Sequence, residues 1–498
     1  MSTQRRRVTA ALASTLAAGA TAHAANVSPL ILFNLEPFAD ASGIVATYST
    51  SGRIDTRNPF FQSLGSNGRS CATCHVASQA MSIAPPEIRL RFYATRGQDP
   101  LFAPVDGANC TTARRGDPAA HSLLLGHGLI RIGLTLPANP QFTLSVVHDP
   151  YGCALTTDPT SGAVTVSVYR RPLPTTNLNF LSTVMWDGRE TLSVLNNGST
   201  FLANLQADLA DQAKSAVTGH AQGAAPPAAT LSQIVDFELG LYSAQVLDWS
   251  AGLLSLRGAH GGPVNLASQE YYPGINDSLG ADPSGDSFDS SAMSAFAAWS
   301  QAGTTSRDWN QDGSAAARRA IAAGEQLFNT APLTITNVRG LNDNAALGKP
   351  AAIAGTCTTC HDSPNVGNHS FPLPLDIGIG HSALPNFESD AAIAAALAEV
   401  DAADLPVFRI DGCPDPFHPG RAATVYTTDA GKALLTGLCA DVSRLKGPIL
   451  RGLAARAPYF HNGAAASLSQ VVDFYDQRFN MNLSRQQQAD LVAFLGSL

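Results

Sequence analysis

The sequence predicts a mainly α protein with two tandem domains of related design and a loop-rich, partly β insertion in its N-terminal half. Two observations lead to this prediction. The pattern C-x-x-C-H occurs at residues 71–75 and again at residues 357–361, so each half of the 498-residue chain holds one copy. In addition, M-W-D-G at residues 185–188 is echoed by F-H-N-G at residues 460–463. Motifs that recur in the same order indicate two related units in tandem.

Each C-x-x-C-H pentad has the spacing by which a chain attaches a c-type haem. The two thiols form thioethers with the porphyrin vinyl groups, and the adjacent histidine is placed to bind the iron. The alternatives are a thioredoxin-like C-x-x-C and half of a zinc site, but the first lacks a βαβ setting and the second needs paired ligands nearby. The predicted haem residues are Cys71, Cys74 and His75 in the first pentad and Cys357, Cys360 and His361 in the second.

Residues 1–24 have the pattern of a secretory signal peptide. Three arginines precede a short alanine-rich apolar run, and Ala22-His23-Ala24 forms a small-x-small cleavage site. A twin-arginine signal is the alternative, but c-type haem is attached after export, so the chain need not cross the membrane already folded. No later segment reaches about eighteen unbroken apolar residues. We therefore expect a periplasmic protein without a membrane span.

The charge balance excludes nucleic acid as a partner. The chain has 31 Lys and Arg against 39 Asp and Glu, a formal net charge of −8. Removal of the leader takes away three arginines and no acids, which leaves 28 basic against 39 acidic residues, a net charge of −11. An acidic chain repels a phosphate backbone.

Four cysteines lie outside the pentads, and in an oxidising compartment they should form disulfides. Three connectivities are open. The local connectivity joins Cys110 to Cys153 and Cys413 to Cys439 and keeps each bridge within one haem domain.

The two predicted haem domains span residues 25–310 and 311–498. An inserted lobe at about residues 105–175 contains a strand at 164–169, where apolar and polar side chains alternate. Several helices are predicted where Ser or Thr stands three positions before Gln and an apolar run follows. These boxes open at Thr230, Ser467 and Ser484, and a further, alanine-rich amphipathic helix is expected at residues 315–328, leading toward the second pentad.

With these motifs placed, the chain resembles the bacterial di-haem cytochrome c peroxidases and their MauG-like relatives. The resemblance covers most of the chain after the leader, in order, with the inserted lobe and the residues after Glu190 as additions. It implies cytochrome c-like domains, with peroxide meeting the first haem and electrons entering at the second. The matching motifs are N-G-R-S before the first pentad, M-W-D-G-R at 185–189, D-Q-A at 211–213, G-E-Q-L-F at 324–328, K-G-P-I-L-R-G-L at 446–453 and A-P-Y-F-H-N-G at 457–463.

The resemblance also implies roles for residues near the second haem. His361 is the expected ligand on one face, and the family places Met or Tyr on the other, fourteen residues after the Pro-Tyr-Phe-His histidine, which is Tyr475 here. His461 and His369 remain alternative ligands, because imidazole binds haem iron well. Trp186 matches the tryptophan that lies between the two haems, although a buried core indole is the commoner role of this residue type.

Two features depart from the family pattern. The family moves a proton during peroxide cleavage with a glutamate ten residues after the glutamine of its L-x-x-Q-A motif. Counting from Gln212, that position is Gln222, an amide that cannot carry the proton. His220 is the alternative carrier, unless it is an exposed histidine at a helix end.

The family also holds a calcium ion between the haems, partly through backbone carbonyls before Pro-Tyr-Phe-His. Arg456 adds a cation there, where Thr is usual.

We therefore expect a periplasmic di-haem peroxidase that reduces hydrogen peroxide. Its electrons would come from a small cytochrome c or a cupredoxin, enter at the C-terminal haem and reach the N-terminal haem. Two other functions stay open. One is a di-haem oxygenase or a MauG-like enzyme that oxidises another substrate, and the other is a non-catalytic di-haem electron carrier.

Overall fold

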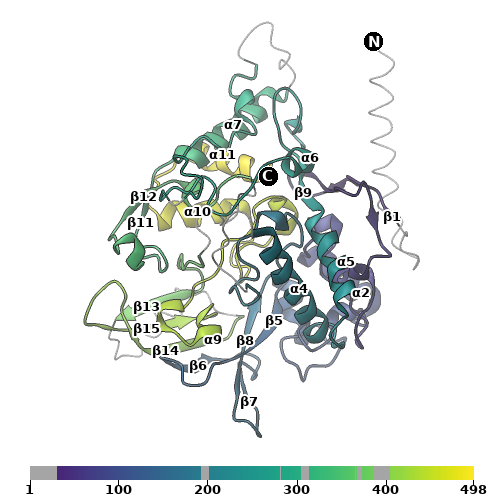
Figure 1. Ribbon diagram of the computed structural model, residues 1–498, viewed down its shortest axis with the longest axis vertical. Helices are drawn as coiled ribbons and strands as arrows, with labels where there is room; N and C mark the ends of the chain where they lie inside the picture. The colour runs from purple at the N-terminus through teal and green to yellow at the C-terminus, as the bar shows by residue number, and fades with distance from the viewer. Residues whose placement is uncertain are drawn as a thin grey trace.

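The computed structural model describes residues 31–191, 201–280, 282–303, 313–364, 366, 373–385 and 404–498. The expected signal peptide and His369 lie outside the described residues. Within them, helices share the chain with five small sheets (Figure 1). The mainly α class and the two domain limits stay predictions.

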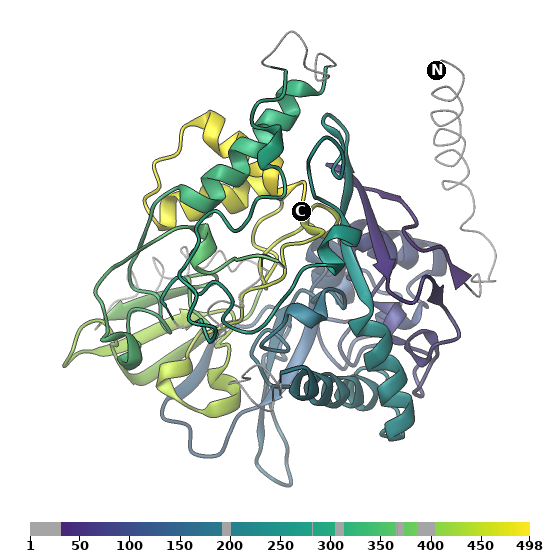
Figure 2. The same cartoon turned by 45° about the horizontal axis from the view of Figure 1, so that its top comes forward.

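Two groups of helices lie on different sides of the molecule, one around α4 and α5 and one around α7, α10 and α11, while α9 lies beside the strands β14 and β15 (Figures 1 and 2). The helix bounds are α2 (Pro85–Thr95), α3 (Ser122–His127), α4 (Phe201–Gly219), α5 (Ala228–Leu239), α6 (Pro263–Ala267), α7 (Ala315–Thr330), α9 (Ala433–Thr436), α10 (Leu468–Arg478) and α11 (Arg485–Leu495).

The sheets have two, three or four strands. The strands are β1 (Ile31–Leu32), β2 (Phe38–Ala39), β3 (Gly43–Ser49), β4 (Ile54–Asp55), β5 (Ile130–Thr135), β6 (Thr143–His148), β7 (Leu155–Thr157), β8 (Val164–Arg170), β9 (Leu241–Asp248), β10 (Gly252–Leu253), β11 (Leu333–Ile335), β12 (Ile353–Gly355), β13 (His381–Pro385), β14 (Val407–Pro414) and β15 (Ala422–Thr427). The strand orders are β1-β4, β10-β9-β3-β2, β11-β12, β13-β15-β14-β6 and β5-β8-β7.

The C-terminal helices begin where the capping residues predict. The side chain of Ser467 accepts a hydrogen bond from the amide of Gln470 at the start of α10, and Ser484 caps α11 in the same way. Helix α11 packs closely on α7 because α7 carries Gly324, where an added Cβ would lie 2.0 Å from the Asp490 carbonyl oxygen. This close contact fixes the helical side of the second cavity described below.

In the N-terminal half, α5 begins earlier than expected. Pro227 is its N-cap and the helix starts at Ala228, so Thr230 lies inside the first turn rather than before it. A proline holds φ near the helical value, and here it starts the helix ahead of the expected capping box. Helices α4 and α5 pack together and build one side of the first cavity.

The inserted lobe is not a separate unit. Its strand β8 appears where expected, but β6 pairs antiparallel with β14 of the C-terminal half, with Leu144 opposite Ile410. Strands β13, β14 and β15 had no clear signal in the sequence. Apolar side chains from both halves, including Val168 and Phe408, form one buried core under these sheets.

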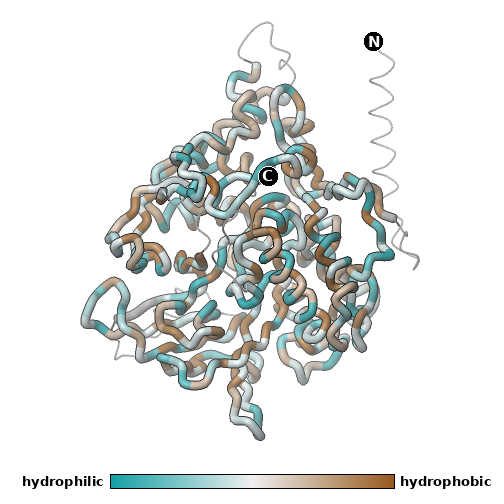
Figure 3. The backbone as a smooth tube through the Cα atoms, viewed as in Figure 1, coloured by the Kyte–Doolittle hydropathy of each residue, from teal (hydrophilic) through white to brown (hydrophobic). Residues whose placement is uncertain are grey.

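Both expected disulfide pairs lie at bonding distance. The Cα atoms of Cys110 and Cys153 are 6.0 Å apart, and those of Cys413 and Cys439 are 5.4 Å apart. The local connectivity is therefore the one that the fold brings together. Polar and apolar segments alternate along the chain (Figure 3), and no helix among the described residues is long and apolar enough to cross a bilayer.

A buried ion-pair network joins three segments that are distant in the sequence. Arg170, the last residue of β8, donates two hydrogen bonds to Asp429 at 2.6 and 2.9 Å and a third to Asp187. All three side chains are at most 2% exposed. The network holds the end of β8 against the W-D-G turn and against the turn after β15.

Replacing Arg170 by Met should destabilise the protein by about 3–5 kcal/mol, because two buried carboxylates would lose their shared cation. Chemical unfolding followed by circular dichroism measures this. The matched control is Arg57→Met, which breaks an ion pair between Arg57 and Asp55 on the surface and should change stability little. Equal effects of both changes would show that the network is not a structural anchor.

Candidate haem sites

Two large cavities lie next to each other, and each contains one C-x-x-C-H turn. The first is lined by Cys71, Cys74 and His75 and has about 1410 Å³ of empty space, including its opening. The second is lined by Cys357, Cys360 and His361 and has about 1770 Å³. Both are large enough for a porphyrin, and their walls are mainly apolar.

The two pentads fold in the same way. Each forms a short 3-10 turn that begins after a hydroxyl residue, and a threonine in the turn completes a reciprocal capping box: Thr73 with Ser70 in the first and Thr359 with Thr356 in the second. The amide of His75 donates to the carbonyl of Cys71 at 3.1 Å, and His361 repeats this bond at 2.9 Å. One turn thus presents two sulfurs and one imidazole to each cavity, as covalent haem attachment requires.

The orientation of His75 fits an axial ligand. Its Nδ1 donates to the carbonyl oxygen of Met81 at 3.0 Å, so Nε2 is the nitrogen that remains for iron. Burial lowers the pKa of His75 to about 4, which keeps the ring neutral, and a metal ligand must be neutral. Burial also lowers the pKa of His361 to about 4, so the second histidine is in the same state.

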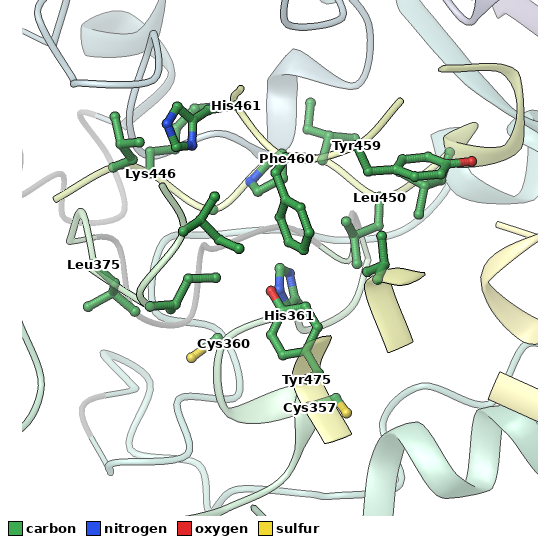
Figure 4. A pocket seen from close by; sticks show the side chains of 18 of the residues that line it. Cys357, Cys360, His361, Leu375, Lys446, Leu450, Tyr459, Phe460, His461 and Tyr475 are labelled. Atoms are coloured by element: carbon green, nitrogen blue, oxygen red, sulfur yellow. The ribbon is translucent and has the colours of Figure 1, made fainter. Parts of the chain in front are cut away.

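Tyr475 faces His361 in the second cavity. It projects from α10, and the centres of the two rings are 6.4 Å apart at an interplanar angle of 81° (Figure 4). Burial raises the pKa of Tyr475 above its ordinary value, so the side chain is a phenol in these surroundings. This arrangement supports Tyr475 as the residue on the other face of a haem held by His361.

His461 has a different environment. Figure 4 shows it apart from the pair formed by His361 and Tyr475. Its ring centre lies 6.2 Å from that of Trp186, and its buried Nε2 has no hydrogen-bond partner among the described residues. Burial lowers the pKa of His461 to about 4. The ring therefore lines the second cavity as a neutral imidazole on the side of the shared wall.

Trp186 belongs to the wall between the two cavities and lines both of them. Its indole Nε1 donates to the carbonyl oxygen of Arg171 at 2.8 Å, and its own carbonyl accepts from the amide of Lys446 at 2.7 Å. The side chain is only 9% exposed. The indole is thus held in one orientation between the two sites.

His220 lines the first cavity and is held by an acid that the sequence analysis missed. Its Nδ1 is hydrogen-bonded to Asp106, which also forms a buried ion pair with Arg69. Burial acts to raise the pKa of Asp106, but the contacts of its carboxylate with His220 and Arg69 outweigh burial, and the pKa is lowered. Asp106 is therefore an anion that orients the ring and leaves Nε2 of His220 to exchange a proton.

Of the two glutamines predicted for this site, Gln212 lies in the first cavity and Gln222 lies outside it. Gln212 of α4 lines the first cavity. Gln222 does not line it, and its side chain is exposed at the surface next to Asn67. The segment carrying His220 and Gln222 is brought close by Gly65, because an added Cβ there would lie 1.9 Å from the Ala221 carbonyl oxygen.

Glu238 is a second acid of the first cavity that the sequence analysis did not identify. It lies in α5, is 4% exposed and accepts a hydrogen bond from the hydroxyl of Thr175 at 2.8 Å. Its Oε2 has no partner among the described residues, and burial raises its pKa to about 7. The signal that would have found it is an acid placed within the apolar run of a predicted helix.

Two adjoining cavities, each with a C-x-x-C-H turn, are the arrangement that a di-haem c-type protein requires. Over part of its length, the chain is similar to curated cytochrome-c peroxidases. It is 27% identical over 156 residues to the cytochrome-c peroxidase IdrP1 of Pseudomonas sp. (strain SCT), an alignment that covers 28% of this chain and 36% of that protein. It is 40% identical over 78 residues to the cytochrome-c peroxidase IdrP2 of Denitromonas iodatirespirans, covering 14% and 21%.

A third relative is the cytochrome c551 peroxidase of Nitrosomonas europaea, which is 37% identical over 70 residues, or 14% of this chain and 21% of that protein. The chain thus aligns with about a third or less of the length of these relatives. A solved MauG-like protein associated with microbial copper homeostasis aligns over 89% of this chain and 87% of its own, at 13% identity and a TM-score of 0.33. No known family profile matches the chain. The sequence matches confirm the resemblance to cytochrome c peroxidases that the motifs predict.

Intact mass of the purified protein should exceed that of its polypeptide by two haems. Replacing both Cys71 and Cys74 by Ala should remove the mass of one haem, because a thioether needs the sulfur. Replacing Cys110 and Cys153 by Ala is the control and should leave the haem mass unchanged. A parent mass with one haem or none would contradict two covalent sites.

Tyr475→Phe should open one coordination position of the second haem and change its absorption spectrum, because the phenol oxygen is lost while the ring is kept. His461→Ala should leave the ligand set unchanged. Tyr93→Phe, at a residue that is 68% exposed, is the control. The opposite pattern, with a changed spectrum in His461→Ala only, would assign the ligand to His461.

Proposed function

We propose that this chain is a periplasmic di-haem peroxidase that reduces hydrogen peroxide to water with electrons from a small cytochrome c or a cupredoxin. The observation that carries the proposal is that two cavities with C-x-x-C-H turns share Trp186 in their common wall. An arrangement with two connected redox sites suits a reaction that needs two electrons at one place. The similarity to curated peroxidases supports the same activity.

Bound haem would supply the iron that accepts electrons and on which peroxide is reduced. The residues of the chain would supply the protons. Reduction of one peroxide to two waters consumes two electrons and two protons, so the first cavity needs a group that moves protons. His220 would meet this need, because Asp106 holds its ring through Nδ1 and its Nε2 is not used in that hydrogen bond.

The second cavity would receive the electrons. His361 and Tyr475 both line this cavity, with their ring centres 6.4 Å apart, and would be the residues that hold the iron of its haem. Trp186 would provide the route to the first cavity, since its indole lines both cavities and is easier to oxidise than a phenyl ring.

One observation favours a second candidate, a MauG-like enzyme or di-haem oxygenase that oxidises another substrate. Tyr475 faces His361, and a tyrosine oxygen lowers the potential of a haem iron relative to methionine. A lower potential makes oxidised states easier to reach, and an enzyme that oxidises a substrate uses such states. Peroxide turnover with an artificial donor, compared with stable oxygen binding to the reduced protein, separates the two candidates. A protein that shows neither peroxide turnover nor stable oxygen binding would be an electron carrier.

His220→Ala should lower peroxide turnover by roughly a hundredfold or more, because the proton carrier of the first cavity is lost. Asp106→Asn should have a smaller effect of the same kind, since it weakens the hydrogen bond that orients the His220 ring. Gln222→Glu should change little, because that side chain lies outside the cavity.

The matched control for this series is His418→Ala. His418 forms a similar pair with Asp415, with Nδ1 and Oδ2 2.8 Å apart, but its side chain is 57% exposed and lies outside both cavities. Steady-state turnover of peroxide with one artificial donor measures all four variants. A fast His220→Ala enzyme together with a gain in Gln222→Glu would show that His220 is not the proton carrier and that a carboxylate at position 222 can reach the reaction.

Trp186→Phe should slow electron transfer between the two sites while leaving the fold intact, because phenylalanine fills the space but lacks the easily oxidised indole. Stopped-flow reduction of the second haem, followed by oxidation with peroxide, measures this transfer. Trp249→Phe, at a residue that is 51% exposed, is the control. Equal rates in the parent and in Trp186→Phe would make Trp186 a structural residue.

A further inference from the structure

The wall between the two cavities contains three buried cations. Arg171 and Lys446 line both cavities, and Arg456 lines the second. Their side chains belong to residues that are 5%, 5% and 8% exposed, respectively. Among the described residues, none of the three forms an ion pair with a carboxylate. Three positive charges thus share one buried wall.

The guanidinium group of Arg171 is surrounded by backbone carbonyl oxygens. Its Nη1 donates to His127 at 3.2 Å and to Gly128 at 2.9 Å. Its Nη2 donates to Ile83 at 2.9 Å and to Arg456 at 3.1 Å. These oxygens come from three separate segments of the chain, which one side chain therefore joins.

The guanidinium group of Arg456 has a similar environment. Its Nη2 donates to the carbonyl oxygens of Ile449 and Arg451 at 2.7 and 2.8 Å, and its Nε donates to that of Gly452 at 3.2 Å. All three oxygens belong to the loop that precedes A-P-Y-F-H-N-G. The loop thus folds around the side chain of Arg456, which follows these residues in the chain.

Converging carbonyl oxygens are the ligands that a hard cation such as calcium uses. In this wall, the oxygens already accept hydrogen bonds from guanidinium groups. Burial lowers the pKa of Arg171 to about 9 and that of Arg456 to about 10, so both stay charged at neutral pH. A divalent cation would be repelled by these charges and would find its carbonyl ligands occupied. The residues of this wall therefore do not fit the calcium ion that the family resemblance implies.

We propose that the guanidinium groups of Arg171 and Arg456 take the place of a bound divalent cation in the wall between the two cavities, so that the wall forms without calcium. The backbone of Arg171 connects this anchor to both sites. Its carbonyl accepts the hydrogen bond of the Trp186 indole, and its amide donates to the carbonyl of His461 at 2.7 Å. Holding the Arg171 side chain therefore fixes the backbone segment that binds the Trp186 indole and the His461 main chain.

This proposal rests on the two-cavity arrangement and not on peroxide reduction. Its first test uses the full-length parent protein with its haems, purified without added calcium. Elemental analysis should find less than about 0.1 calcium per chain, and neither a chelator nor added calcium chloride should change the melting temperature. About one calcium per chain, or a melting temperature that falls when the chelator is added, would overturn the proposal whether or not the protein reduces peroxide.

The second test removes the guanidinium group. Arg171→Asn leaves the four carbonyl oxygens without their donor, so the melting temperature should fall, and added calcium should then raise it by several degrees. Arg171→Lys keeps a positive charge and should show a smaller response to calcium. Arg53→Asn, at an exposed arginine, is the matched control and should show none.

An Arg171→Asn protein whose melting temperature does not respond to calcium would show that the guanidinium group does not replace a metal ion. If Arg171→Asn fails to fold, Arg456→Thr takes its place with the same expected gain of a calcium response. A calcium response of Arg456→Thr no larger than that of Arg53→Asn would equally overturn the proposal.

Discussion

The buried contact of Arg170 with Asp187 and Asp429 is the constraint on which the arrangement of the two sites depends. It joins the end of β8, the W-D-G turn and the turn after β15, and all three charged groups are removed from water. A buried charge without its partner is strongly unfavourable, so the three segments are held in one arrangement. That arrangement brings the carbonyl of Arg171 to the indole of Trp186, and the shared wall follows from it.

The two sites use one local structure with different surroundings. The same hydroxyl-capped turn presents the cysteines and the histidine in both halves. Around the first turn are polar groups that can carry protons, with Asp106 and His220 as an oriented pair and Glu238 as a buried acid. Around the second turn, Tyr475 lines the cavity close to His361 and is buried as a neutral phenol. The proposed division of labour, with peroxide at the first site and electron entry at the second, would use this difference.

The inserted lobe takes part in both halves rather than standing apart. Asp106 comes from its beginning and orients His220, while β6 adds a strand to the sheet of β13, β15 and β14. Arg170 and Arg171 lie at its end and anchor the wall. The lobe is therefore part of the candidate site, to which it contributes Asp106, Arg170 and Arg171.

The sequence by itself determined the features that depend on neighbouring residues. The cysteines and histidine of each pentad, the caps at Ser467 and Ser484 and the alternation in β8 act within a few positions, so pattern and propensity predict them. Tertiary structure decided the features that join distant residues. His220 and Asp106 are 114 residues apart, β6 and β14 lie in different halves, and the oxygens around Arg171 come from three segments. No local periodicity encodes such contacts, because they form only when burial in a common core brings the segments together.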